Sequence, residues 1–144
     1  MATDASPIAV MSTDDCWSRL ASLTIGRFAT SVDGQPDVFP VNFVVQGRTI
    51  LIRTAEGTKL VSALVNDRVA FEADDHDVAH GWSVVVKGRA EVLSTARELA
   101  VADAAQVLPW TSTPKERYLR IVPTEITGRL FDFGAATPPV VDAS

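Results

Sequence analysis

The chain has 144 residues, of which 47% are hydrophobic, and a formal net charge of −5. This length corresponds to one domain, and a core of this size forms without disulfides or metal ions. The acidic balance argues against nucleic acid as a main partner, and the single cysteine, Cys16, excludes an intrachain disulfide.

A membrane span needs about 20 consecutive apolar residues, and no run in the sequence approaches that length. The N-terminus lacks the basic-then-apolar order of a signal peptide. We therefore expect a soluble, cytoplasmic protein with one domain at 12–134, an N-terminal arm at 1–11 and a flexible C-terminal tail at 135–144.

The first expected element is a short helix. Ser12 is a hydroxyl cap followed by acidic residues in the first turn. Trp17, Leu20 and Leu23 follow at intervals of three residues and give the helix one apolar face.

After this helix, short apolar segments separated by turn residues indicate strands. Asp33-Gly34 and Gln46-Gly47 predict tight turns, and Pro40 indicates an edge or a bulge because proline cannot donate to the ladder. Thr95 and Glu98 form a capping-box pair at the start of a later helix. The expected strands are 26–32, 38–45, 49–54, 68–73, 82–93, 118–122 and 126–131, with helices at 58–66 and from 95 to about 107.

Six or seven antiparallel strands with few helices predict a mainly β fold, a closed or nearly closed barrel. The turns are too short for a doubly wound parallel sheet, in which each strand needs a long crossover connection.

The turn after the third strand carries a chemical signal. Arg53, Thr54, Thr58 and Lys59 surround a glycine-containing turn that leads into a helix. Helix N-termini bind anions, and a guanidinium and an ammonium strengthen such a site. We therefore expect the phosphate of a small molecule here. The alternative is that the cations are solvated and that Thr58 only caps the helix.

Five segments follow one another at characteristic spacings: Gly26-Arg-Phe-Ala-Thr, Pro40-Val-Asn-Phe-Val, Arg53-Thr-Ala-Glu-Gly-Thr-Lys, Trp82-Ser-Val-Val-Val-Lys-Gly-Arg-Ala and Ile121-Val-Pro-Thr-Glu-Ile-Thr-Gly-Arg129. In order and spacing they resemble the flavin-binding split-barrel family typified by pyridoxamine 5′-phosphate oxidase. The resemblance is strongest to its small single-domain branch, which includes nitroimidazole-resistance-type and deazaflavin-using relatives.

The resemblance implies an antiparallel split β-barrel that forms a homodimer, with two FMN sites between the protomers. It assigns cofactor contacts to Pro40, Val41, Asn42, Arg53, Thr54, Thr58, Lys59, Trp82 and Ser83. The turn beginning at Arg53 would hold the FMN phosphate, and the strand containing Asn42 would run beside the isoalloxazine ring. Trp82 and Ser83 would reach the flavin from the partner protomer.

The implied activity is that of an FMN-dependent oxidoreductase that passes hydride or electrons to an unidentified small molecule. Alternatives are a deazaflavin-dependent reductase on the same fold, a non-enzymatic flavin-binding or storage protein, and a barrel for another ligand such as lipid or haem. The chain ends soon after Phe133, before the segment that completes the vitamin B6 site of the oxidases proper, so vitamin B6 oxidation is not expected. The sequence reveals no dedicated acid or base near the expected flavin.

Other residues have two interpretations. The acidic segment Glu72–His80, which contains His76, could be a metal site, but we favour a solvated loop and expect no metal. Trp110 either covers the flavin ring or lines a substrate pocket, or it fills the core after the helix. Cys16 is expected to be a buried, unreactive thiol.

Overall fold

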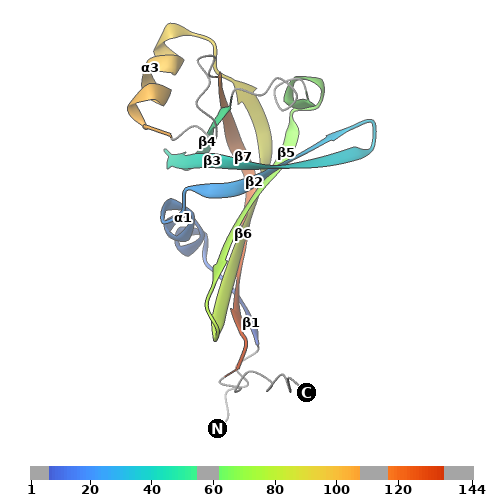
Figure 1. Ribbon diagram of the computed structural model, residues 1–144, viewed down its shortest axis with the longest axis vertical. Coiled ribbons are helices and arrows are strands. Elements are labelled where there is room, and N and C mark those ends of the chain that lie inside the picture. Colours follow the sequence, from blue (N-terminus) through green and yellow to red (C-terminus); the bar gives the residue numbers. More distant parts are fainter. Residues whose placement is uncertain (1–6, 55–61, 108–116, 135–144) are drawn as a thin grey trace, which may run out of the picture.

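The computed structural model of the chain describes residues 7–54, 62–107 and 117–134 (Figure 1). Among these residues, no helix has the length and apolar character needed to cross a bilayer. The elements are β1 (Ile8–Val10), α1 (Thr13–Ala21), β2 (Ile25–Val32), β3 (Gln35–Gln46), β4 (Thr49–Thr54), β5 (Arg68–His76), β6 (His80–Val92), α3 (Ala96–Ala104) and β7 (Arg117–Asp132).

The strands form one antiparallel sheet that closes on itself. Hydrogen-bonded neighbours follow the order β1-β7-β4-β3-β2-β5-β6, and β6 pairs again with β7. Strands β2 to β7 thus make a ring, while β1 pairs with the second half of β7, beyond the part that pairs with β4. This confirms the prediction of a mainly β, antiparallel split barrel.

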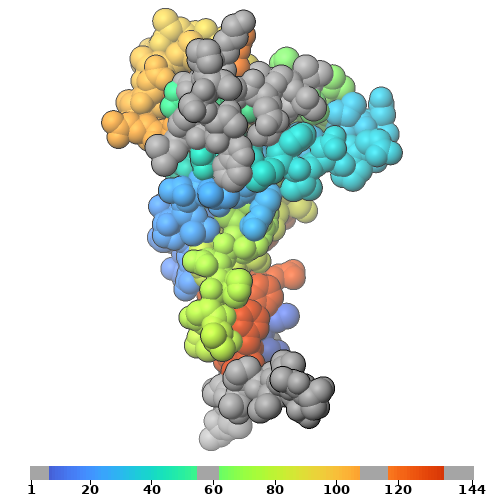
Figure 2. All heavy atoms as spheres, viewed as in Figure 1, coloured from blue at the N-terminus to red at the C-terminus, as the bar shows by residue number. Residues whose placement is uncertain are grey.

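Two long strands give the molecule an elongated shape. β6 pairs with β7 along its whole length, whereas only residues 117–121 of β7 pair with β4. The rest of β7 and the tip of the β5–β6 hairpin extend past α1 as an arm, with β1 along its end (Figure 1). The β2–β3 hairpin projects from the barrel in another direction (Figure 2).

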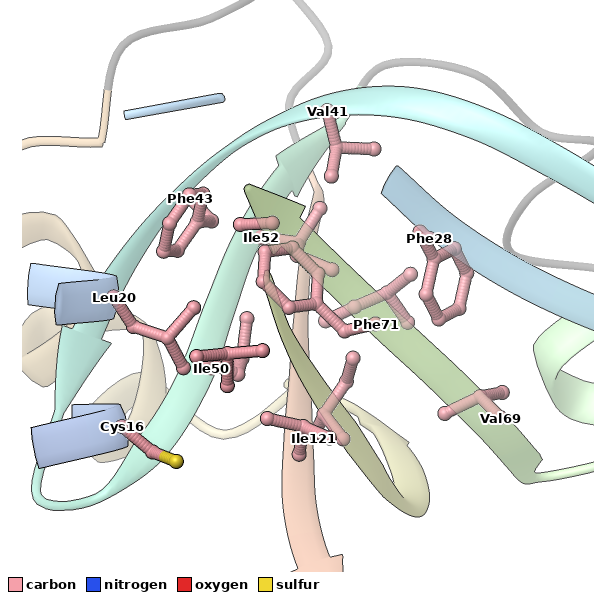
Figure 3. Close-up of a cluster of buried hydrophobic side chains, with 14 of the residues drawn as sticks. Cys16, Leu20, Phe28, Val41, Phe43, Ile50, Ile52, Val69, Phe71 and Ile121 are labelled. Atoms are coloured by element: carbon pink, nitrogen blue, oxygen red, sulfur yellow. The ribbon is translucent and has the colours of Figure 1, made fainter. Parts of the chain in front are cut away.

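Alternate side chains of the strands fill the barrel. Phe28, Phe43 and Phe71 are fully buried, and the rings of Phe43 and Phe71 meet edge-on with centroids 4.6 Å apart. Cys16 and Leu20 of α1 are buried against these strands (Figure 3). The prediction of a buried thiol is therefore confirmed, and burial raises the pKa of Cys16.

α3 packs on the outside of the barrel. Its Ala102 lies with Leu51 of β4 and Tyr118 of β7 in a second buried cluster. The predicted capping box is present, because Thr95 Oγ1 accepts the Glu98 N–H and Glu98 Oε1 accepts the Thr95 N–H, both at 3.1 Å. The helix thereby covers part of the outer face of β4.

Both tight turns are present, one of them shifted. Asp33 and Gly34 join β2 to β3 with φ values of 50° and 77°, as predicted. The sequence places the second turn at Gln46-Gly47, but β3 includes Gln46, and the turn residues are Gly47 and Arg48 with φ values of 57° and 53°. Two consecutive left-handed residues form the hairpin turn whose twist matches that of the strands.

Pro40 lies in β3, at the edge that the sequence predicts. Residues 35–42 pair with β2, whereas β4 pairs only with residues 43–46. Phe43 donates its N–H to the Thr24 carbonyl on the β2 side at 3.0 Å. Because peptide groups alternate in direction along a strand, the nitrogen of Pro40 faces away from β2. Its missing N–H therefore breaks no bond of the β2–β3 ladder.

The sequence divides the last strand at Pro123, but β7 is continuous through that residue. Its register against β6 shifts there, with Lys87 opposite Glu125 and Gly88 opposite Pro123, which leaves Thr124 as an extra residue. The prediction of two strands was wrong because a β-bulge accommodates proline where the ladder is already interrupted.

Two other boundaries differ from the sequence expectation. Residues 8–10 of the expected N-terminal arm form β1, a strand too short for its alternation to be recognised. The fourth strand, expected to end at residue 73, continues to His76, and β6 begins at His80. The expected acidic loop is therefore a turn of residues 77–79.

Candidate functional site

Arg53 lies on the outer face of the barrel. Side chains alternate between the two faces along β4. Those of Ile50 and Ile52 are in the core, so that of Arg53, like that of Leu51, faces outward. Arg53 Nη1 donates to the Val107 carbonyl at 2.9 Å, and its guanidinium carbon lies 5.9 Å from the centre of the Tyr118 ring. The charge is thus half-buried and held in one place.

Tyr118 links this arginine to α3. Its hydroxyl donates to Asp103 Oδ1 at 2.6 Å. Burial, followed by this hydrogen bond, raises the pKa of Tyr118, so the phenol is neutral at physiological pH. Strands β4 and β7 and helix α3 therefore meet around the Arg53 guanidinium.

The other residues of the expected phosphate site are placed differently. Thr54 is 6% exposed and alternates with Arg53, so its side chain faces the interior. Thr58 and Lys59 lie outside the described residues, as does Trp110. Among the described residues of this turn, Arg53 is the one whose side chain lies on the outer face.

The three expected contacts on β3 divide between the two faces. Val41 is 1% exposed and belongs to the core, so only its backbone remains for contact with a ligand. Pro40 is exposed and Asn42 is 9% exposed, and both lie on the outer face. Continuing the β3–β4 register by one residue puts Asn42 opposite Arg53. The extended register therefore places these two side chains on the same face of neighbouring strands.

Trp82 and Ser83 also face opposite sides. Trp82 is buried in the core cluster, with the guanidinium carbon of Arg19 5.7 Å from its ring centre, and it lines a cleft of about 520 Å³ on the arm. Ser83 is half-buried on the outer face, opposite Asp74 on β5 and Arg129 on β7. Of this pair, Ser83 presents its side chain to the outer face.

One row of outer-face residues crosses five strands and contains Arg53, Asn42, Ile25, Asp74 and Ser83. Asn42 lies opposite Ile25 on β2, and Asp74 on β5 lies opposite Ser83 on β6. Continuing the β2–β5 register by two residues puts Ile25 opposite Asp74. Arg53 and Ser83 are thus four strand spacings apart, about 19 Å along the curved sheet.

Residues 12–130 match the sequence model of the family described as pyridoxamine 5′-phosphate oxidase. The chain belongs to this pyridoxamine 5′-phosphate oxidase-like family. The match includes β2 to β6 and most of β7, and therefore the whole outer-face row. The resemblance read from the five sequence segments is confirmed.

Solved structures of relatives share the fold. The FAD-binding protein of Mycobacterium smegmatis is 54% identical over 88% of this chain and 100% of that chain, with a TM-score of 0.79. A FAD-binding protein of Mesorhizobium loti is 26% identical over 85% of this chain and 96% of that chain, with a TM-score of 0.75. In sequence, an uncharacterized protein of Mycobacterium tuberculosis is also similar to this chain, with 60% identity over 91 residues, which are 63% of this chain and 83% of that protein. Flavin-binding proteins are thus among the neighbours of this family member.

A charged cluster on β2 and β5 was missed by the sequence analysis. Arg27 Nη1 lies 2.9 Å from Glu72 Oε1 and 3.2 Å from Asp74 Oδ2, on the outer face between Asn42 and Ser83. The spacing of Glu72 and Asp74 shows that the two carboxylates share one strand face. Their partner is 45 residues away from Glu72 in the sequence, and only the β2–β5 pairing brings it there.

The acidic turn between β5 and β6 has a local structural role. The Asp77 carboxylate accepts the N–H groups of His80 and Ala79 at 2.7 and 2.8 Å, and these hydrogen bonds lower its pKa. In the part of the chain that the structure describes, no group of three His, Cys, Asp or Glu residues is arranged to hold a metal ion. The turn is closed by Asp77 itself.

Proposed function

We propose that this protein binds a flavin nucleotide on the outer face that carries Arg53, Asn42 and Pro40, and that it acts as a flavin-dependent oxidoreductase. The observation that carries the proposal is the 54% identity to a FAD-binding protein along the full length of that chain. The anchored guanidinium of Arg53 supports it, because a positioned arginine suits a phosphate group.

FAD is the first candidate, and FMN, which the sequence analysis favours, is the second. Both contain the isoalloxazine ring, the ribityl chain and the phosphate attached to it. The two relatives that bind FAD support FAD. We infer that the phosphate next to the ribityl chain lies at Arg53, with Thr58 and Lys59 as further contacts, and that the ring lies beside Pro40 and Asn42.

We further propose that two copies of the chain build each site. Arg53 and Ser83 lie about 19 Å apart along the sheet of one protomer, so Ser83 of a second copy is better placed to meet a flavin held at Arg53. Val85 supports this arrangement. It is half-buried on the outer face between Ser83 and Lys87, where an apolar side chain suits a packed protein surface.

A bound flavin supplies transfer of hydride or single electrons, and the protein supplies binding and orientation. Arg53 would offset the charge of the phosphate, and the Asn42 amide would hydrogen-bond the edge of the ring. The substrate is a small molecule that stacks on the open face of the ring.

Flavin titrations test the proposal. Purified protein is titrated with FAD, FMN, riboflavin and a deazaflavin cofactor, and flavin absorbance and fluorescence are followed. We expect saturable binding of FAD and FMN and weaker binding of riboflavin, which has no phosphate. Binding of the deazaflavin alone would favour the deazaflavin-dependent reductase. A flavin that binds but is not reduced by NADH or NADPH would favour flavin storage. Binding of none would reject a flavin function.

A further inference from the structure

The cluster of Arg27, Glu72 and Asp74 places two carboxyl groups against one guanidinium. Glu72 and Asp74 are two residues apart on β5 and therefore share the outer face. Arg27 Nη1 contacts both, at 2.9 Å and 3.2 Å. One cation cannot neutralise two carboxylates, so the cluster retains a negative charge unless one carboxyl is protonated.

The cluster holds a proton close to neutral pH. Burial, and then hydrogen bonding to Asp74, raises the pKa of Glu72 to about 7, whereas the hydrogen bond from Glu72 lowers the pKa of Asp74. The two carboxyls thus titrate as a pair that shares a proton.

The residues that face the carboxyl pair lie on β2, β5 and β6. On β2 the facing charge is Arg27, and on β5 it is His76, beyond Asp74. On β6, Val85 and Ser83, which lie opposite Glu72 and Asp74, are neutral, and Lys87 is the diagonal neighbour.

The cluster lies beside the proposed flavin. Pro40 and Glu72 are both opposite Arg27, on either side of β2. Two strand spacings, about 10 Å, therefore separate their backbones. Asp74 lies opposite Ser83, so on one protomer the carboxyl pair lies between Asn42, beside that protomer's own proposed flavin, and Ser83, which would contact the flavin of the other copy.

Next to the cluster is room for a second molecule. A cleft of about 560 Å³ runs along β2, β5 and β6, and small residues such as Ala29 and Ala70 line it. These two alanines face each other in the register, two residues from Arg27 and Glu72. Glu72 follows Ala70 on the same face of β5, so the carboxyl pair lies just beyond the residues that line this cleft.

We propose that Glu72 is the acid and base of the flavin site, exchanging a proton with the substrate, while Arg27 and Asp74 are positioning residues. The inference rests on the proposed flavin function. A bound, reduced flavin would supply hydride to a substrate double bond, and Glu72 would supply the proton that completes the addition. Its carboxylate then regains a proton from water, so that the substrate gains two electrons and two protons in total.

The experiment compares the wild-type protein with Glu72→Gln and Asp74→Asn. Glu125→Gln is the matched control, because Glu125 is an outward carboxylate paired with Lys87 at 3.7 Å. Two quantities are measured against pH: the carbon-13 shifts of the glutamate carboxyls without flavin, and the reduction potential of the bound flavin. Neither depends on knowing the substrate.

In the wild type we expect one glutamate that titrates near pH 7 and a bend in the potential–pH curve at the same pH. Glu72→Gln should lose both, Asp74→Asn should move both to lower pH, and Glu125→Gln should keep both. A glutamate titration near pH 7 that survives in Glu72→Gln, a wild type without one, or a potential–pH curve that is the same in the wild type and in Glu72→Gln would overturn the role of Glu72 and leave flavin binding intact. A wild type that binds no flavin would instead overturn the proposed function, and this inference with it.

Discussion

Arg53 and Val107 are joined by a hydrogen bond of 2.9 Å from Nη1 to the backbone carbonyl, although 54 residues separate them in the sequence. The bond ties the end of β4 to the segment after α3, and the Tyr118 ring lies beneath the guanidinium. It uses one of the five N–H donors of the arginine. The position of this cation is therefore set before any ligand arrives, which reduces the entropy cost of binding.

Replacing this arginine should weaken binding of flavins that carry a phosphate. Loss of one charge-assisted contact costs about 1.5–3 kcal/mol, so Arg53→Ala should lower FAD affinity about 10- to 150-fold. Riboflavin affinity should change little, because riboflavin has no phosphate. Fluorescence titration measures both, with Arg97→Ala, at an exposed position of α3, as the control. An unchanged FAD affinity, or an equal loss for riboflavin, would contradict the role of Arg53.

The raised pKa of Glu72 predicts a stability that depends on pH. Its pKa rises from 4.5 to about 7 on folding, so between these values the folded state binds more protons than the unfolded state. The free energy of unfolding should therefore fall as the pH rises through this window. The lowered pKa of Asp74 acts in the opposite direction but at more acidic pH, below its ordinary value of 3.8, so it leaves this window almost unchanged.

Glu72→Gln removes this dependence. Relative to the wild type, the variant should gain on the order of 1 kcal/mol between the acidic and the alkaline side of the window. Denaturant titrations at several pH values measure the difference, and Glu125→Gln should show no such gain. A stability difference that is the same at every pH would count against the shared proton.

Gly88 should not tolerate a side chain. A Cβ at this position would lie 2.9 Å from Pro123 Cα and closer still to the Val122 carbonyl oxygen, both of them backbone atoms of the bulge. Gly88→Ala should destabilise the fold by about 1–3 kcal/mol, as overpacking does. Gly34→Asn is the control, since Gly34 has open space and a φ of +77° that asparagine tolerates. Thermal unfolding with an unchanged midpoint for Gly88→Ala would contradict this packing.

The proposed two-copy site predicts that a charge at Val85 separates the protomers and abolishes flavin binding. Val85→Asp would bury a carboxylate in the packed surface, which is unfavourable without a partner. Val101→Asp is the control, because Val101 is 46% exposed on α3. Light scattering and FAD titration are carried out on the same samples. A monomeric Val85→Asp protein that keeps full FAD affinity would show that one chain suffices.

Local signals in the sequence predicted local structure well. Ser12 accepts the Asp15 N–H at the start of α1, and the capping box at Thr95 is formed. Asp33-Gly34 makes the expected turn. Each signal depends on residues within a few positions of one another, so sequence patterns contain it. The continuous β7 was missed because Pro123 is usually a strand breaker, and only the pairing with β6 reveals the bulge.

The candidate site could be predicted only in part. The types of residue in the turn after β4 pointed to a phosphate, but the contact of Arg53 with Val107 depends on where α3 packs. In the same way, the charge of Glu72 can be read from the sequence, but its pairing with Arg27 cannot. The closure of the barrel places Arg27 beside it. Which residues face inward, as Val41 does, follows from the register and not from the motif.

The most direct test of the central claim is a FAD titration of the purified protein, followed by flavin absorbance and by the mass of the complex. We expect saturable binding of one FAD per chain in a dimer, and riboflavin binding that is weaker by about tenfold or more. If neither FAD nor FMN binds saturably, the assignment of the outer face beside Arg53 to a flavin is wrong.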